Sequence, residues 1–189
     1  RQGALDVQPL TESGNTIDGL CDVLVSRGYQ EAVTYSFVDP GLQASINPHM
    51  TPVPLANPIS SEMAEMRTSL WPGLLTAVKY NLRRQKSRLR FFEHGLRFYS
   101  RDGEIHQDMM LAGVVTGARL PEHWDGKGDP VDFFDMKGDM EALFSLTGNA
   151  RAFTFVAAEH AALHPGQCAQ IRYEQSRGGW AGRLHQLLA

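Results

Sequence analysis

Histidine and cysteine are the residue types of this chain best suited to binding a metal ion or transferring a proton, and it has seven and two of them. Among the histidines only His160 and His164 are spaced i, i+4, which on a helix would place two zinc ligands on one face. Pro165 follows directly, so a loop is expected there and zinc binding is disfavoured. Cys21 and Cys168 lie far apart in a helical and a strand pattern, which predicts no disulfide framework and fits a reducing compartment.

The other chemistry-bearing residues form no recognised catalytic arrangement. His94 lies in a strand pattern, where a histidine is usually a satisfied core or interface residue, and the trio His123-Trp124-Asp125 in a polar loop supports no mechanism. Gly95, Gly113 and Gly117 are not followed directly by a helix, so they do not form a phosphate-binding fingerprint. The sequence also lacks a G-x-S-x-G motif and paired catalytic carboxylates.

A cluster of cations is the strongest candidate for a nucleic-acid contact. It consists of Arg83, Arg84, Lys86, Arg88 and Arg90. The first four are candidate contacts to RNA phosphates, with an affinity that falls steeply with salt. The alternative is a solvated helix end and strand edge, or a patch that meets acidic groups of a partner. We favour this alternative, because no aromatic residue suited to base stacking is interleaved outside a strand that should be buried.

The cations lie between a predicted helix and a predicted strand. Pro72 is suited to the first turn of a helix, and an apolar stripe at helical spacing follows, formed by Trp71, Leu75, Val78 and Leu82. Cations near the C-terminus of this helix are favoured by the macrodipole by about 0.3–1 kcal/mol each. The period then changes to 2 over residues 91–99, which predicts a strand buried at least partly on both faces.

The remaining elements follow from periodicity and from turn residues. We expect a helix from residue 17, capped by Asn15 or Thr16 and ended by Gly28, then a strand over 29–38. Five prolines between residues 39 and 58 predict a loop with at most one short helical turn. The later helical elements are a turn of helix from residue 60 and a helix from 133 to 144 that ends by 148. The later strands lie at 109–116 and near 153–155, 167–173 and 180–184. Turns at 102–103 and 164–166, an exposed loop at 119–130 and a loop at 176–179 separate these elements. Because no βαβ regularity appears, we predict an α+β fold with a mainly antiparallel sheet flanked by helices.

Length and composition indicate one globular domain. The chain has 189 residues, of which 42% are hydrophobic, and this is enough for one sizeable core. Its net charge of −3 argues against a globally basic nucleic-acid binder. No apolar run reaches the ~18 residues of a membrane span, and the first ten residues lack the apolar core of a signal peptide, so we expect a chain that is neither inserted nor exported.

Several motifs in a fixed order resemble one family. NPISSEMAEMRTSLWPGLL from residue 57 and FFEHGLRFYS from residue 91 are similar to the catalytic-like core of the bacterial phenylalanyl-tRNA synthetase beta subunit, and to the approach to motif 2 in class II synthetases. TYSFVDP from residue 34, VDFFDMKGDMEAL from residue 131 and LHPGQCA from residue 163 match the same family in the right order and spacing. The resemblance covers residues 17–185 and implies a class II synthetase-like fold, truncated on the C-terminal side.

The resemblance also implies where a class II enzyme would bind ATP. After F-E-x-G-x-x-F such enzymes carry an R-x-E signature whose arginine holds the α-phosphate. In this chain the pattern places Tyr99 at the arginine and Arg101 at the glutamate. A phenol offers one hydrogen bond and no charge, and the chain stops at Ala189, before a third motif with a second arginine would lie. We therefore expect no catalytic, cofactor-binding or metal-binding residues in it, and no activity of this domain alone.

A scaffolding role beside a catalytic alpha subunit is the function that the resemblance implies. The family enzyme is a cytoplasmic heterotetramer of two alpha and two beta chains, which charges tRNA with phenylalanine using ATP and magnesium. Interface candidates are Leu20, Leu24, Tyr35, Phe37, Arg67, Trp71 and Leu75. Two alternatives stay open: a tRNA-binding module that uses the cations at 83–90, and an active ligase with an unconventional site.

The predicted organisation is a lead-in segment followed by one domain. Residues 1–14 have no periodicity and are read as an extended approach from an upstream segment. Residues 15–189 form the synthetase-like core domain of the beta subunit, which we expect to be incomplete.

Overall fold

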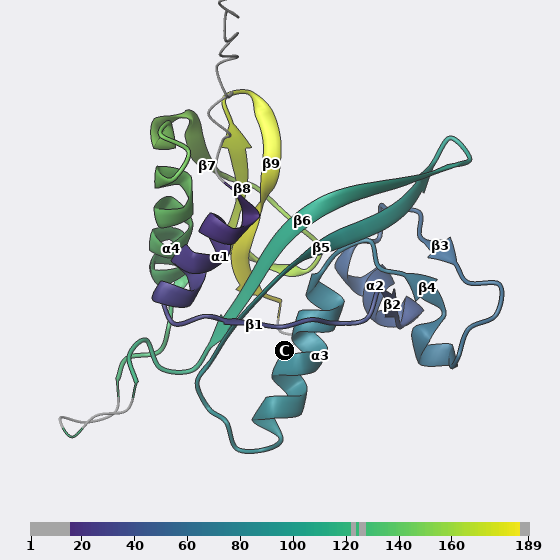
Figure 1. Cartoon of the computed structure of the whole chain (residues 1–189), viewed down its shortest axis with the longest axis horizontal. Helices are drawn as coiled ribbons and strands as arrows, with labels where there is room; N and C mark the ends of the chain where they lie inside the picture. The colour runs from purple at the N-terminus through teal and green to yellow at the C-terminus, as the bar shows by residue number, and fades with distance from the viewer. Residues whose placement is uncertain (1–15, 122–123, 125–127, 186–189) are drawn as a thin grey trace, which may run out of the picture.

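A long antiparallel hairpin forms the centre of the molecule (Figure 1). This computed structural model describes residues 16–121, 124 and 128–185. Strands β5 (Leu89–Arg101) and β6 (Glu104–Thr116) pair along their whole length, and the short strand β1 (Gln30–Glu31) runs parallel to β5. The two residues between β5 and β6 have positive φ, 54° at Asp102 and 82° at Gly103, which confirms the predicted turn and its preference for these residue types.

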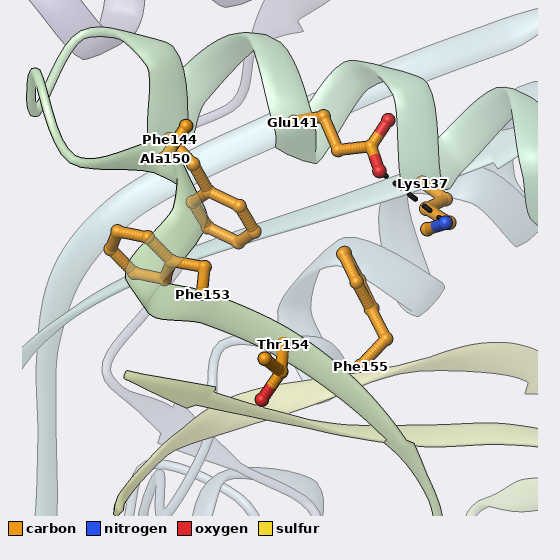
Figure 2. Close-up of a pocket in the computed structure, with 7 residues that line it drawn as sticks. All are labelled: Lys137, Glu141, Phe144, Ala150, Phe153, Thr154 and Phe155. Carbon is orange, nitrogen blue, oxygen red and sulfur yellow. Dashed lines mark ion pairs between the residues drawn. The ribbon is translucent and has the colours of Figure 1, made fainter. Parts of the chain in front are cut away.

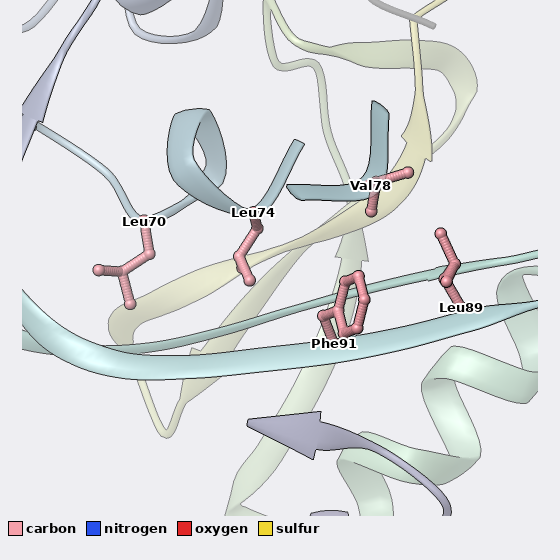
Figure 3. Close-up of a cluster of buried hydrophobic side chains, with 5 residues drawn as sticks. All are labelled: Leu70, Leu74, Val78, Leu89 and Phe91. Atoms are coloured by element: carbon pink, nitrogen blue, oxygen red, sulfur yellow. The ribbon is translucent and has the colours of Figure 1, made fainter. Parts of the chain in front are cut away.

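Helices cover both faces of the hairpin (Figure 1). Helix α3 (Trp71–Leu82) packs on one face, where Leu70, Leu74, Val78, Leu89 and Phe91 form a buried cluster (Figure 3). Helices α1 (Ile17–Ser26) and α4 (Phe133–Ser145) lie on the other face, around a second cluster of Leu24, Tyr29 and Phe92. Adjacent Phe91 and Phe92 therefore point to opposite faces, as the predicted strand requires.

Two further sheets complete the described part. β7 (Phe153–Ala157), β8 (Leu163–Tyr173) and β9 (Ser176–Leu184) form an antiparallel sheet in that order. β2 (Phe37–Val38), β4 (Glu65–Met66) and β3 (Val53–Pro54) form a small one, next to α2 (Pro40–Ile46), and the 3₁₀ turns η1 (Ser61–Met63) and η2 (Ala150–Ala152) connect other elements. Among the described strand pairs only β1–β5 is parallel, which confirms the α+β, mainly antiparallel prediction. None of the described helices is long and apolar enough to span a bilayer.

The predicted helix ends are mostly confirmed. Thr16 caps α1 through a 3.2 Å bond from the Gly19 amide, and Gly28 and Gly148 follow α1 and α4 with φ of 82° and 68°. Asp132 and Asp135 form a capping box at the start of α4. The alternative cap Asn15, the lead-in 1–14 and most of the 123–125 trio lie outside the described residues.

Five predictions about local structure were wrong. The strand over 29–38 is interrupted, because beyond Ala32 the chain leaves β5 and the Thr34 amide bonds the side chain of Glu93. The proline-rich loop contains the seven-residue helix α2, since Asp39 caps it and Pro40 occupies its first position, where no amide donor is needed.

The other three concern residues 164–166 and 176–179 of the β7–β9 sheet and the apolar stripe of α3. Residues 164–166 were expected as a turn but lie inside β8, at a shift of its register with β9. Residues 176–179 were expected as a loop but belong to β9, because the chain reverses earlier, at Glu174, which has a φ of 53°. The buried stripe of α3 runs through Leu74 and Val78, and Leu82, which was predicted to continue the stripe, is 45% exposed.

Candidate functional site

A buried ion pair joins two of the motifs that carry the family resemblance, those that start at residues 57 and 91. Arg67 follows β4, Glu93 lies in β5, and the distance from Arg67 Nη1 to Glu93 Oε1 is 2.6 Å with both side chains about 5% exposed or less. Thr34 donates two more hydrogen bonds to this carboxylate, from its hydroxyl at 2.7 Å and its amide at 3.2 Å. The guanidinium also donates from Nε to the Leu96 carbonyl at 2.9 Å. The two charged side chains bind each other, so the pair links the segment after β4 to β5.

Two glycines leave space for Arg67 and for Thr34, the residue that bonds Glu93. A Cβ at Gly95 would lie 2.5 Å from Arg67 Nη2, and a Cβ at Gly73 would overlap the Thr34 side chain. Gly95 of F-E-x-G and Gly73 at the start of α3 are therefore required by packing.

The position predicted to lack the phosphate-binding arginine lies on the outer half of the hairpin. Tyr99 stacks on His106 across the strand pair, with ring centroids 5.4 Å apart. The guanidinium carbons of Arg97 and Arg101 lie 5.2 and 5.5 Å from the Tyr99 ring. Arg97 is itself bound to Asp108 at 2.8 Å, and this hydrogen bond lowers the pKa of the Asp108 carboxyl. An unconventional ligase site would need several free cations converging here, but among the described residues Arg97 is paired with a carboxylate, and of these two arginines only Arg101 is not.

An open depression of about 350 Å³ adjoins Tyr99. It is lined by His49, Met50, Thr51, Tyr99, Ser100, Arg101 and Asp102. The Asp102 carboxylate beside Arg101 opposes the positive charge that a nucleotide phosphate would require.

A second depression, of about 340 Å³, lies between α4 and β7 (Figure 2). Its walls are aromatic: Phe144 stacks on Phe153 with centroids 4.0 Å apart, and Phe155 lies opposite. Lys137 and Glu141 at its rim form an ion pair of 3.3 Å. Its other polar side chain is the Thr154 hydroxyl, and the lining has no histidine or cysteine that could activate it. The sequence pattern did not predict this depression.

A second buried charge network ties α4 to the hairpin. Asp139 of α4 accepts hydrogen bonds from Arg27 at 2.5 Å, from the Tyr29 hydroxyl at 2.7 Å and from Arg90 at 2.9 Å. Burial, followed by the hydrogen bond to Asp139, raises the pKa of the Tyr29 phenol. Arg90 is 9% exposed, so this member of the predicted cation cluster belongs to the interior.

Three of the described histidines and one cysteine contact neighbouring groups of the chain. His94 Nδ1 lies 3.1 Å from Glu31 Oε1 and 3.8 Å from Cys21 Sγ, so the carboxylate and the thiol share one ring nitrogen. Burial and then the Glu31 charge raise the pKa of the Cys21 thiol, which disfavours the nucleophilic thiolate. His160 accepts from the Ala162 amide at 3.1 Å, and His164 bonds the adjacent Pro165 carbonyl. Within the described residues, no group of three or more histidine, cysteine, aspartate or glutamate side chains could hold a metal ion.

The remaining cations differ in their surroundings. Arg88 donates to the carbonyls of Ala118 and Arg119, at 3.1 and 3.3 Å. Arg83, Arg84 and Lys86 are exposed at the end of α3. The Arg84 guanidinium lies 3.4 Å from the centre of the Tyr80 ring, an aromatic contact that sequence analysis missed, although the i, i+4 spacing allows it.

The seven interface candidates occupy different depths. Leu24 and Arg67 are buried within the chain, at 5% and 4% exposure, so they can affect an interface only by positioning the exposed residues around them. Tyr35 is 73% exposed, and its neighbour Val33, which sequence analysis did not single out, is 91% exposed. Half-buried positions are taken by Leu20, Phe37, Trp71 and Leu75. Trp71 contacts the His160 ring, which in turn contacts Trp180 of β9.

Solved structures of class II synthetases share this fold. Two structures of the pyrrolysyl-tRNA synthetase of Desulfitobacterium hafniense align with TM-scores of 0.60 and 0.59, at 15% and 16% identity. Each alignment covers 84% of this chain and 51% or 54% of the other. At such low identity the likeness establishes the fold alone.

Sequence relatives are much closer. The phenylalanine–tRNA ligase beta subunit of Nitrosococcus oceani is 52% identical over 185 residues, and that of Pseudomonas putida is 50% identical over 188. The alignments cover 96% and 100% of this chain but 23% and 24% of the relatives, so the chain spans about a quarter of their length. The model of the phenylalanyl-tRNA synthetase beta chain CLM domain matches residues 2–189. A full-length family match and relatives at about 50% identity thus agree with the motifs braced by Arg67 and Glu93: the chain belongs to the family of the phenylalanyl-tRNA synthetase beta chain CLM domain.

Proposed function

We propose that this chain is a non-catalytic scaffolding domain, which supports the catalytic alpha subunit of an enzyme that charges tRNA with phenylalanine. The observation that carries the proposal is Tyr99, stacked on His106 where the resemblance places a phosphate-binding arginine in an active enzyme. A developing negative charge at a phosphate needs fixed donors with positive charge. Of the nearby guanidiniums, those of Arg67 and Arg97 are bound to carboxylates.

ATP and magnesium are accordingly assigned to the alpha subunit. The proposed assembly is a cytoplasmic heterotetramer of two alpha and two beta chains, with this domain on the beta side. Its support is the family membership and the two internal charge networks, which use the buried charged residues of the domain to brace the fold.

Tyr35 and Val33 are the proposed centre of the contact with the alpha subunit. They lie on the extended segment between β1 and β2, and both side chains are apolar and largely exposed. Leu24 and Arg67 hold the neighbouring elements from inside. An exposed apolar pair on a rigid support is typical of an interface anchor.

Co-purification with a separately expressed alpha subunit tests this contact. Val33→Asp with Tyr35→Asp should weaken the complex by at least about 30-fold, equivalent to the ~2 kcal/mol of an anchor residue. Ile59→Asp is the matched control, because Ile59 is 84% exposed on a different loop. Equal binding by the three proteins would contradict the proposed contact, and absence of a complex with the parent chain would contradict the scaffolding role.

Calorimetric titration with ATP and with phenylalanine tests the absence of catalysis. We expect no binding in the micromolar range to the folded chain. Micromolar ATP binding that is lost in Arg101→Gln would identify an active nucleotide site and would overturn the proposal.

A further inference from the structure

We propose that the C-terminal end of α3 binds the phosphate backbone of tRNA. This surface, the α3 basic end, consists of Lys79, Tyr80, Arg83, Arg84 and Lys86. The inference rests on the proposed function for the identity of the RNA, while the surface itself is argued from charge, exposure and an aromatic contact.

Uncompensated positive charge is the first observation. All four cations are exposed, and none of them takes part in an ion pair of the described residues. By contrast Arg90, which sequence analysis grouped with them, is neutralised by Asp139. Four unpaired cations within eight residues are concentrated on a chain whose net charge is −3, so the positive charge is local. A polyanion that releases counterions on binding is the partner that such a surface favours.

The backbone holds these cations in place. The amides of Arg84 and Lys86 both donate to the Asn81 carbonyl, at 2.9 and 3.2 Å, and Gln85 adopts a left-handed conformation with φ of 64°. This closing turn fixes the backbone positions of Arg84 and Lys86. Lys79 and Arg83 lie one helical turn apart, about 6 Å along the axis, so the cations form a row followed by a turn.

An exposed aromatic ring is the second observation, and it distinguishes RNA from an acidic protein. Tyr80 is 55% exposed and carries the Arg84 guanidinium 3.4 Å above its ring centre. Unstacked RNA bases stack on tyrosine rings and on guanidinium planes, whereas an acidic protein surface needs only the charges. The aromatic residue whose absence argued against RNA on sequence grounds is therefore present, one turn before Arg84.

Fluorescence anisotropy with a labelled phenylalanine-specific tRNA transcript tests the surface. The variant Arg83→Gln, Arg84→Gln, Lys86→Gln should lower the slope of log K against log [NaCl] by about 2 to 3, since each phosphate contact contributes about 0.7–0.9 between about 50 and 200 mM salt. Tyr80→Ala should weaken binding by about 5- to 100-fold and leave the slope unchanged.

The matched control removes equal charge elsewhere. Arg151, Arg177 and Arg183 are exposed residues of the β7–β9 region and take part in none of the described ion pairs. Their triple replacement by Gln should change the slope by less than about 0.5. Equal effects of the two triple variants, or competition by polyglutamate as effective as that by unlabelled tRNA, would overturn the proposal, because either result indicates non-specific attraction of anions.

Co-purification of the same variants with the alpha subunit separates this inference from the proposed function. The α3 variants should keep the complex while losing tRNA affinity. Loss of the complex together with tRNA binding would assign the α3 basic end to the subunit interface and overturn the inference. If the parent chain forms no complex yet its tRNA binding depends on these residues, the scaffolding role fails and the RNA surface stands.

Discussion

Replacing Arg67 by methionine should destabilise the chain strongly, because it leaves a buried carboxylate without its cation. Glu93 is 3% exposed and takes its only charged hydrogen bond from Arg67 among the contacts of the described residues. Methionine has a similar length and fills much of the same space, so the substitution removes charge and hydrogen bonds with a small change in volume.

The magnitude follows from the contacts that remain. Breaking a buried ion pair from one side costs about 3–5 kcal/mol. The two hydrogen bonds from Thr34 to Glu93 persist, so we expect a cost near the lower end of this range. The Leu96 carbonyl also loses the Arg67 donor, which adds about 1 kcal/mol. We therefore expect a loss of about 4 kcal/mol, or about 8–16 °C in melting temperature for a domain of this size. In the double variant with Glu93→Gln the loss should fall to about 2 kcal/mol, because no charge is left unpaired.

Urea unfolding followed by tryptophan fluorescence measures both losses. Arg97→Met is the matched control: it also removes an arginine bound to a carboxylate, but Asp108 is 42% exposed, so the cost should stay below about 1 kcal/mol. A bracing role of the pair would be refuted if the free energy of unfolding of Arg67→Met lay within about 1 kcal/mol of that of the parent, or if the double variant were less stable than Arg67→Met. In either case the pair does not brace the fold.

Two further predictions concern pH and the second network. Burial lowers the pKa of His160 below its usual 6.5, so the unfolded chain binds the proton first, and stability should be full above about pH 6.5 and fall as the pH drops further. His160→Asn keeps an acceptor for the Ala162 amide and should reduce the loss of stability at low pH, measured in thermal melts between about pH 7.5 and 5. The control His164→Asn should leave that loss unchanged, and equal pH dependence in the parent and both variants would contradict a role of His160. Asp139→Asn should lower the free energy of unfolding by about 3 kcal/mol in urea titrations, because the buried Arg90 guanidinium loses its counter-charge, and a loss below about 1 kcal/mol would contradict this.

Local signals in the sequence predicted the elements that surround the site. Pro72 and the apolar spacing after it predicted α3, and the change of period predicted β5, because both depend on residues within a few positions of one another. Helix α2 was missed because the five prolines between residues 39 and 58 were read as allowing at most one short helical turn, although Pro40 occupies the one turn that tolerates proline. The broken strand after β1 was missed for a different reason: Thr34 binds a side chain in place of the ladder, and that partner lies 59 residues away.

The charge networks and the aromatic contacts depend on distances that periodicity does not encode. Arg67 and Glu93 are 26 residues apart, and Arg27 and Asp139 are 112 apart. An acidic residue among the apolar positions of α4 is a signal that points to a buried partner at Asp139, but it does not name that partner. Tyr80 was overlooked because it lies on the polar face of α3, where its role depends on the neighbouring Arg84.

The Arg67–Glu93 pair also gives the motifs around it a role in packing. The guanidinium, the carboxylate, Gly95 and Gly73 form one packing unit with Thr34, so replacing any of them disturbs the others. Tyr99 lies further out on the same hairpin and outside this unit. The residues that build the fold and the residue that would bind a phosphate are thus structurally independent. The motif at residues 66–69 and the F-E-x-G step therefore report architecture, and activity has to be judged at position 99.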